Sequence, residues 1–215
     1  MALLGLSACA SKSLLSEVGS AVFFDNLPFQ TPLTPDDKLN PNYRYLQVTL
    51  AGTKPALLVL GYVDAHPQGE VEVWYSANGE VLRLQNGRLV GANGLAVDWR
   101  RVDYAQPPPA WASVPSEGAR FTSVRDEQPG YRLGLVEQVF LTRLQKPPLD
   151  LPANNFAGAV WFLERYSDAN GPTRPDAWFA LGSHGGQSTI VYSRQCLSAS
   201  VCLTLQRWPL EKDRP

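Results

Sequence analysis

Apolar and polar side chains alternate along several short segments of the chain, a pattern typical of β-strands with one buried face. In residues 69–75, valine or tyrosine recurs at every second position, between glutamates and a tryptophan. The apolar runs 44–50 and 56–63 predict two further strands, which pair as a hairpin around Ala51-Gly52-Thr53-Lys54. The hydrophobic pattern therefore predicts a sheet from about Tyr43 onward.

Three Asn-Gly dipeptides separate the short runs that follow. Asn78-Gly79, Asn86-Gly87 and Asn93-Gly94 recur at intervals of eight and seven residues. Asn-Gly tolerates positive φ at both central positions of a type I′ turn, which suits a two-residue hairpin loop. Three such turns in succession predict an up-and-down meander.

Further strands are expected in the second half of the chain. They cover residues 131–144, 159–166, 176–183, 189–193 and 201–205. Proline-rich loops interrupt them. We expect about ten antiparallel strands in an all-β fold, a meander curled into a barrel or sandwich, because a flat sheet of that size leaves long unpaired edges.

The N-terminal part has a different pattern. Apolar residues recur at helical spacing within 13–24, which predicts a short amphipathic helix. Four prolines between 28 and 41 then favour an extended connection. The predicted organisation is the end of a signal peptide (1–8), a tether with this helix and the proline-rich connection (9–42), and one β domain (43–215).

Composition narrows the classes of function. The chain has 19 Lys and Arg against 20 Asp and Glu, so its formal net charge is −1. A nucleic-acid-binding domain normally carries a marked basic excess, and that function is therefore not expected. We also expect no cofactor and no metal: a zinc site needs four ligands, and the two histidines, His66 and His184, are far apart.

The first residues resemble a bacterial lipobox. In Leu6-Ser7-Ala8-Cys9, a leucine and two small residues precede a cysteine. The resemblance implies that Cys9 carries lipid, including palmitate, and that Ala10 after it directs the protein to the outer membrane, on the periplasmic face. Only eight residues precede Cys9, and none of them is Lys or Arg, whereas a signal peptide normally has a basic segment and a longer apolar run.

The two remaining cysteines suggest a disulfide. An even pair in an exported chain favours a bond, and Cys196 and Cys202 are separated by five residues. Because both flanking runs read as strands, the bond would close a short hairpin loop.

Several motifs together resemble the YjbF/GfcB family of bacterial lipoproteins. They are Gly61-Tyr62-Val63-Asp64, Val73-Trp74-Tyr75-Ser76, Asn86-Gly87-Arg88-Leu89-Val90-Gly91, Arg125-Asp126-Glu127 and Pro129-Gly130-Tyr131. The resemblance covers nearly the whole mature chain. It implies a role in producing or exporting group 4 capsule or a related exopolysaccharide, beside other envelope proteins. It implies no catalytic residues.

Two patterns could indicate catalysis. Gly182-Ser183-His184-Gly185-Gly186 places Ser beside His, but neighbours on a strand face opposite sides, so a turn between strands is expected instead. Paired carboxylates suit glycan cleavage. The candidate pairs are Asp126 with Glu127, Glu70 with Glu72, and Asp98 with Asp103.

The alternation in 69–75 also predicts a binding face. It places Val71, Val73 and Tyr75 in the core with Leu82 and Leu84, so that Glu70, Glu72 and Trp74 face outward. An exposed tryptophan can stack on a sugar, and charged groups can bond its hydroxyls or carboxylates. The candidate contacts for a glycan or a protein partner are Trp74, Arg83, Arg88, Arg125 and Asp126.

The leading hypothesis is a non-catalytic lipoprotein that faces the periplasm and is an accessory or docking component in exopolysaccharide production or export. Its expected partners are the membrane, through the lipid anchor, envelope proteins of the export system and the polysaccharide itself. The alternatives are a glycan-processing enzyme that uses a carboxylate pair and a purely structural envelope module.

Overall fold

Twelve antiparallel strands form one closed sheet. The structure is a computed structural model that describes residues 39–210. Its strands are β1 (Tyr45–Leu50), β2 (Ala56–Asp64), β3 (Val71–Tyr75), β4 (Val81–Gln85), β5 (Arg88–Asn93), β6 (Asp98–Tyr104), β7 (Ala119–Gln128), β8 (Arg132–Arg143), β9 (Val160–Asp168), β10 (Gly171–His184), β11 (Gln187–Cys196) and β12 (Cys202–Trp208). Two short 3₁₀ segments, η1 (Trp111–Ser113) and η2 (Ala153–Phe156), lie in loops.

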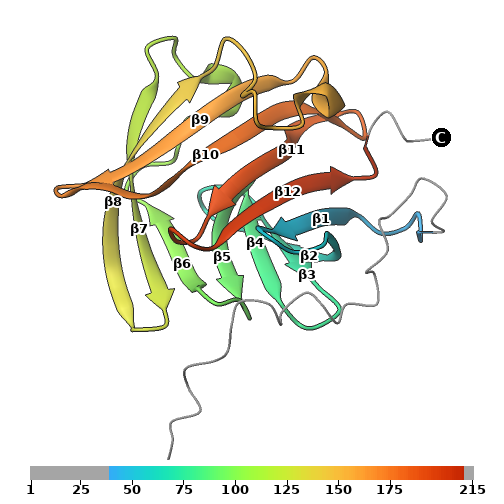
Figure 1. Cartoon of the computed structure of the whole chain (residues 1–215), viewed down its shortest axis with the longest axis horizontal. Coiled ribbons are helices and arrows are strands. Elements are labelled where there is room, and N and C mark those ends of the chain that lie inside the picture. Colours follow the sequence, from blue (N-terminus) through green and yellow to red (C-terminus); the bar gives the residue numbers. More distant parts are fainter. Residues whose placement is uncertain (1–38, 211–215) are drawn as a thin grey trace, which may run out of the picture.

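Each strand pairs with its neighbour in sequence, and the last strand pairs with the first. β1 lies between β2 and β12 in the closed barrel, with Val48 opposite Leu205 (Figure 1). This closure leaves no free sheet edge, which removes the liability of unpaired backbone groups. The all-β prediction is confirmed, and the barrel is the form that the meander takes.

The turn chemistry explains the tight part of the meander. Asn86 and Gly87 have φ values of 50° and 81°, as a type I′ turn requires, and they join β4 to β5. At Asn78-Gly79 and Asn93-Gly94 only the glycine has positive φ, and the loops are longer. The predicted helix at 13–24 and Cys9 lie outside the described residues.

Side chains close both ends of the barrel. At one end η1 folds inward, where the ring of Trp111 packs against Phe162 and Phe179 and its Nε1 donates to the Asn86 carbonyl at 2.8 Å. At the other end the Trp99 Nε1 donates to the Leu197 carbonyl at 3.2 Å. Within residues 39–210 no helix has the length and apolar character needed to cross a bilayer.

The expected orientation of Trp74 is wrong. Register pairs Trp74 with Leu82, and both side chains are buried in one core cluster with residues of β1, β2 and β12. Trp74 has an exposed fraction of 0%, whereas Tyr75, expected in the core, is 39% exposed. Glu72 and Trp74 therefore face inward, and Tyr75 faces outward. The other expected core residues, Val71, Val73, Leu82 and Leu84, are buried as predicted.

Candidate functional site

A network of buried ion pairs crosses the interior of the barrel. Arg88 on β5 reaches Glu164 on β9, with Nε and Oε1 2.7 Å apart. The Arg125 guanidinium lies 2.5 Å from Glu137 and 3.2 Å from Glu127. Buried charges of this kind require partners, because an unpaired charge in a low-dielectric interior is very costly.

The network is extended by aromatic rings and hydroxyls. The Tyr166 hydroxyl donates to Glu164 at 2.8 Å, and the Arg174 guanidinium lies 3.2 Å from the centre of the Tyr166 ring. Arg88 lies over the ring of Trp111 at 3.8 Å. Trp111 therefore closes the barrel by covering a cation as well as by apolar contact.

Electrostatics in the network favour the charged form of Glu137 and the neutral forms of Tyr104 and Tyr166. Burial by itself would raise the pKa of Glu137, but the Arg174 charge, a hydrogen bond from Thr173 and the Arg125 charge outweigh it, so the pKa is lowered. Burial raises the pKa of Tyr104 to about 12 and that of Tyr166 well above its usual value. A carboxyl with a lowered pKa is a poor proton donor for glycoside cleavage.

These side chains fill the barrel interior. Arg88, Arg125, Glu137 and Glu164 line a space of only about 10 Å³ for the centre of a water-sized sphere. Such a volume is roughly the minimum for one water molecule. A sugar residue does not fit in this space among the ion pairs.

The candidate contact residues divide into two groups. Trp74, Arg88 and Arg125 are buried inside the barrel, where an external ligand does not reach them. Arg83 and Asp126 are partly exposed on the outer face. The structure therefore does not bring the five residues together.

Arg83 borders a groove lined by residues of β2 to β6 and of the loop between β2 and β3. We call it the outer groove; it has a volume of about 270 Å³, near the lower limit for small-molecule sites. Val71 and Val90 contribute apolar surface to it, and Arg83 and Arg101 are among the charged side chains that line it. Arg101 pairs with Asp103 at 2.9 Å and lies 3.9 Å from Asp126.

Two exposed tyrosines lie beside this groove. The ring centres of Tyr62 on β2 and Tyr75 on β3 are 6.4 Å apart, and the two exposed fractions are 47% and 39%. A hydrogen bond to Tyr75 is the main reason why the pKa of Tyr62 is raised, and the charges of Asp64 and Arg83 also influence it. Arg83 lies one strand beyond Val73, the register partner of Tyr62, and it lines the outer groove, so the tyrosine pair borders the groove.

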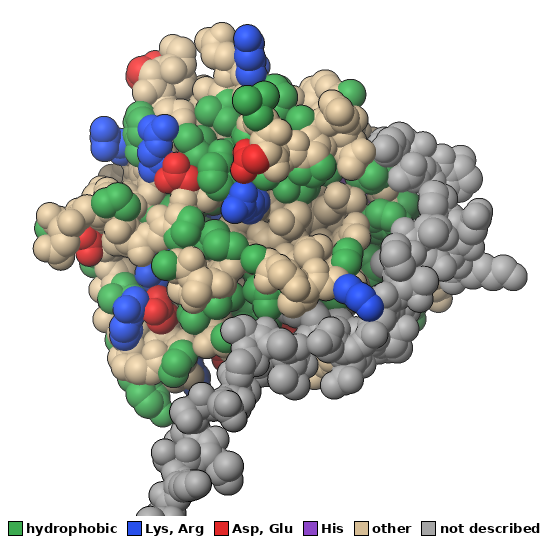
Figure 2. All heavy atoms as spheres, in the orientation of Figure 1, with side chains coloured by type: hydrophobic (Ala, Val, Ile, Leu, Met, Phe, Trp, Pro, Cys, Tyr) green, Lys and Arg blue, Asp and Glu red, His purple; other side chains and the backbone are tan. Residues whose placement is uncertain are grey.

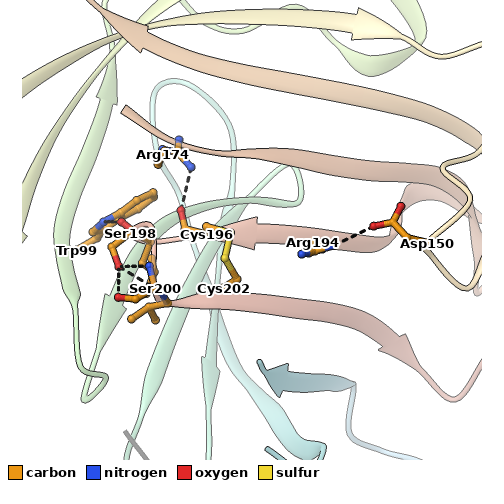
Figure 3. The surroundings of a disulfide bond; sticks show 10 residues. Trp99, Asp150, Arg174, Arg194, Cys196, Ser198, Ser200 and Cys202 are labelled. Atoms are coloured by element: carbon orange, nitrogen blue, oxygen red, sulfur yellow. Dashed lines mark hydrogen bonds and ion pairs between the residues drawn. A yellow bond between two sulfur atoms is a disulfide. The ribbon is translucent and has the colours of Figure 1, made fainter. Parts of the chain in front are cut away.

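The predicted disulfide is present. Cys196 and Cys202 are cross-strand partners at the end of the β11–β12 hairpin and form a bond (Figure 3). The Cys196 carbonyl also accepts a hydrogen bond from the Arg174 Nη1 at 3.1 Å. The hairpin end is thus joined to the interior network through the backbone.

The members of the possible catalytic pairs have different surroundings. Asp126 faces outward, while Glu127 is buried and paired with Arg125 and Arg132. Glu72 also lies inside, 2.6 Å from Arg207, so its expected outward orientation is wrong.

The remaining carboxylate pair and the Ser-His motif are also explained by local structure. Asp98 accepts a hydrogen bond from the Leu95 amide, whereas Asp103 pairs with Arg101. The motif 182–186 is the end of β10 and its turn to β11, as expected. Among the described residues, no group of three or more His, Cys, Asp and Glu side chains is arranged to hold a metal ion.

Sequence reasoning missed the outer tyrosines because it assigned Tyr75 to the core. A signal was present: Gly61 lies opposite β3, and a Cβ at this position would come 2.5 Å from the Tyr75 ring.

On the face shown in Figure 2, Lys and Arg are interspersed with Asp and Glu, in keeping with the near-zero net charge.

Comparison with known proteins shows the family of the chain and a solved structure with a similar fold. The family model described as "Group 4 capsule polysaccharide lipoprotein gfcB, YjbF" matches residues 20–206, most of the chain. The crystal structure of the hypothetical lipoprotein YmcC from Escherichia coli (K12) superposes with a TM-score of 0.59 at 18% identity, covering 77% of this chain and 83% of that one. This similarity shows a shared fold. The chain has no significant match among curated proteins.

Proposed function

Because the chain belongs to the group 4 capsule polysaccharide lipoprotein family, we propose that it is a non-catalytic accessory or docking component in the production or export of a cell-surface polysaccharide. In this proposal the protein is anchored in the outer membrane by lipid on Cys9 and faces the periplasm. Its partners are other envelope proteins of the export system.

The filled interior is the observation that supports docking over catalysis. A barrel that processed glycan inside would need an open cavity with a proton donor, whereas this interior has space for about one water and its carboxylates are ion-paired. The closed sheet instead provides a rigid outer surface. Rigid strands hold exposed side chains in fixed positions, which suits recognition of a partner.

Genetic deletion tests the proposed role. A strain that lacks the gene should lose most of its cell-bound polysaccharide, and the wild-type gene should restore it. Mild crosslinking of the restored strain should capture envelope proteins of the export system together with this protein. Unchanged polysaccharide in the deletion strain would contradict the proposal, and new reducing ends released from purified polysaccharide by the protein would favour a glycan-processing enzyme.

The anchor is tested separately with Cys9→Ser, expressed from the full upstream start of the gene. The wild-type protein should incorporate labelled palmitate and fractionate with the outer membrane, because two or more acyl chains anchor a protein stably. Cys9→Ser should lose both properties, while the control Ser11→Ala should keep them. Equal label in Cys9→Ser and wild type would contradict lipidation at Cys9.

A further inference from the structure

The ring of Tyr75 lies against a glycine of the neighbouring strand. A Cβ built on Gly61 would come 2.5 and 2.7 Å from two adjacent ring carbons of Tyr75, so one edge of the ring lies against the β2 backbone at this glycine. The side chain is nevertheless 39% exposed. Part of the ring is therefore open to solvent, and no side chain at position 61 competes for the space.

Arg83 also lies across a glycine. A Cβ at Gly91 would come 3.1 Å from the Arg83 Cδ, so the aliphatic part of Arg83 crosses the neighbouring strand at a glycine. Its Nη1 donates to the Asn93 side chain at 2.6 Å, which fixes the direction of the guanidinium. Two glycines on adjacent parts of the sheet thus leave room for the side chains of Tyr75 and Arg83 to lie across the neighbouring strands.

The same face continues across the sheet in register. Tyr62 is opposite Val73, Val73 is opposite Arg83, and Arg83 is opposite Gly91. Side chains of directly opposed residues share one face of a sheet. An elongated ligand that crosses the strands would therefore contact the tyrosines first and then the arginine side of the groove.

The charges of the groove determine which ligand fits. Two arginines, Arg83 and Arg101, and two aspartates, Asp64 and Asp103, line it, so the fixed charge is balanced. A strongly anionic surface such as a membrane or a nucleic acid gains little from a balanced groove. Arginine and aspartate together offer donors and acceptors to hydroxyl groups, and an aromatic face packs on the C–H face of a pyranose ring.

We propose that Tyr62, Tyr75 and the outer groove form a binding site for an oligosaccharide segment of the polysaccharide. The inference rests on the proposed function, because that role brings the protein into contact with a polysaccharide. Tyr75 stacks on one sugar ring, Tyr62 borders the same ring, and Arg83 and Arg101 bond hydroxyl or carboxylate groups of the next.

Binding is tested with the full-length lipidated protein in detergent. The probe is the polysaccharide extracted from the source strain and cut into short oligosaccharides, and saturation-transfer NMR and calorimetry report contact and affinity. Tyr75→Ala should weaken binding by about tenfold or more, as expected for a central aromatic contact. Tyr131→Ala is the matched control, because Tyr131 is 79% exposed but lies outside the groove.

Gly61→Ala tests whether binding depends on the position of the Tyr75 ring and not only on its presence. This variant keeps every candidate contact group but forces the Tyr75 ring from its place, so it should weaken binding nearly as much as Tyr75→Ala. Arg101→Ala provides a second route if Gly61→Ala does not fold, since Arg101 is 63% exposed in its side chain. It should weaken binding several-fold.

Two results would overturn the site. One is wild-type protein that does not bind the oligosaccharides. The other is equal affinity in Tyr75→Ala, Arg101→Ala and the Tyr131→Ala control. A Tyr75→Ala protein that loses a crosslinked envelope protein, with no glycan binding in the wild type, would show that the face binds protein instead.

The deletion strain distinguishes failure of the oligosaccharide site from failure of the proposed function. If the strain loses its polysaccharide and Tyr75→Ala restores it fully, the proposed function stands and the binding site is refuted. If the strain keeps its polysaccharide, the proposed function itself is refuted.

Discussion

At the scale of single residues, the orientation of Trp74 depends on which of two apolar sets faces inward. The alternation in β3 places Val71, Val73 and Tyr75 on one face and Trp74 with Glu72 on the other, and both sets contain large apolar side chains. Alternation specifies that the sets are separate but not which one is inside. The cross-strand partner decides: Trp74 is opposite Leu82, which belongs to the interior cluster.

Truncation of Trp74 should therefore destabilise the whole domain. Trp74→Ala removes a fully buried ring and should lower the free energy of unfolding by about 3–5 kcal/mol. Urea unfolding followed by circular dichroism measures this loss. Tyr131→Ala, at an exposed position, should change the free energy by less than about 0.5 kcal/mol. Equal stabilities of the two variants would contradict the interior position of Trp74.

At the scale of elements, the hairpins with clear turn signals could be predicted, whereas β6 and β7 could not. β7 buries Ser123, Arg125 and Glu127 beside a single phenylalanine, so most of its inward face is polar and the usual hydrophobic alternation is missing. The width of the barrel gives a physical reason. Barrel diameter grows with strand number, and a twelve-stranded interior needs long side chains such as Arg, Glu and Trp to fill it.

The outer groove escaped prediction for a related reason. Its members come from several strands, and the register of these strands decides which side chains meet. The register shifts within β2, between Leu60 and Tyr62, and within β4, between Arg83 and Leu84. A β-bulge shifts which residues share a face, and short-range sequence patterns do not locate it. The disulfide, by contrast, could be predicted because both cysteines lie within one hairpin.

The disulfide stabilises the β11–β12 hairpin by restricting the unfolded chain. A double Cys196→Ser, Cys202→Ser variant should lose about 2 kcal/mol of unfolding free energy, as expected for closure of so short a loop. Chemical denaturation of the variant and the oxidised wild type measures the difference. Alkylation of the unreduced, unfolded wild type should modify neither cysteine, and two reactive thiols would show that the bond is absent from the exported protein.

At the scale of the whole molecule, the interior ion pairs join strands that are distant around the barrel. Arg88 and Glu164 link β5 to β9, and Arg207 and Glu72 link β12 to β3. Closure of the barrel brings together residues such as Gln47 and Gln206, which are 159 positions apart. The barrel and its network therefore form together, and protonation of one buried carboxylate affects the stability of the entire domain.

Glu137 makes this coupling measurable as a pH dependence. Its pKa is lower in the folded than in the unfolded protein, because Arg174, Thr173 and Arg125 hold the charged form against the cost of burial. Its contribution to stability is thus fully present above the unfolded pKa, near 4.5, and is lost as the pH falls through the folded pKa. The wild-type free energy of unfolding should decrease in this acidic range.

Glu137→Gln should be less stable at neutral pH by about 3–5 kcal/mol, because it leaves buried arginines without their partner. Its free energy of unfolding should also fall less steeply below pH 4.5, since the titrating group is gone. Denaturant melts between pH 7 and pH 3 measure both effects. Glu117→Gln removes an exposed carboxylate and is the matched control. If Glu117→Gln reduces the loss of unfolding free energy below pH 4.5 as much as Glu137→Gln does, the pH dependence arises from surface charge and not from the buried network.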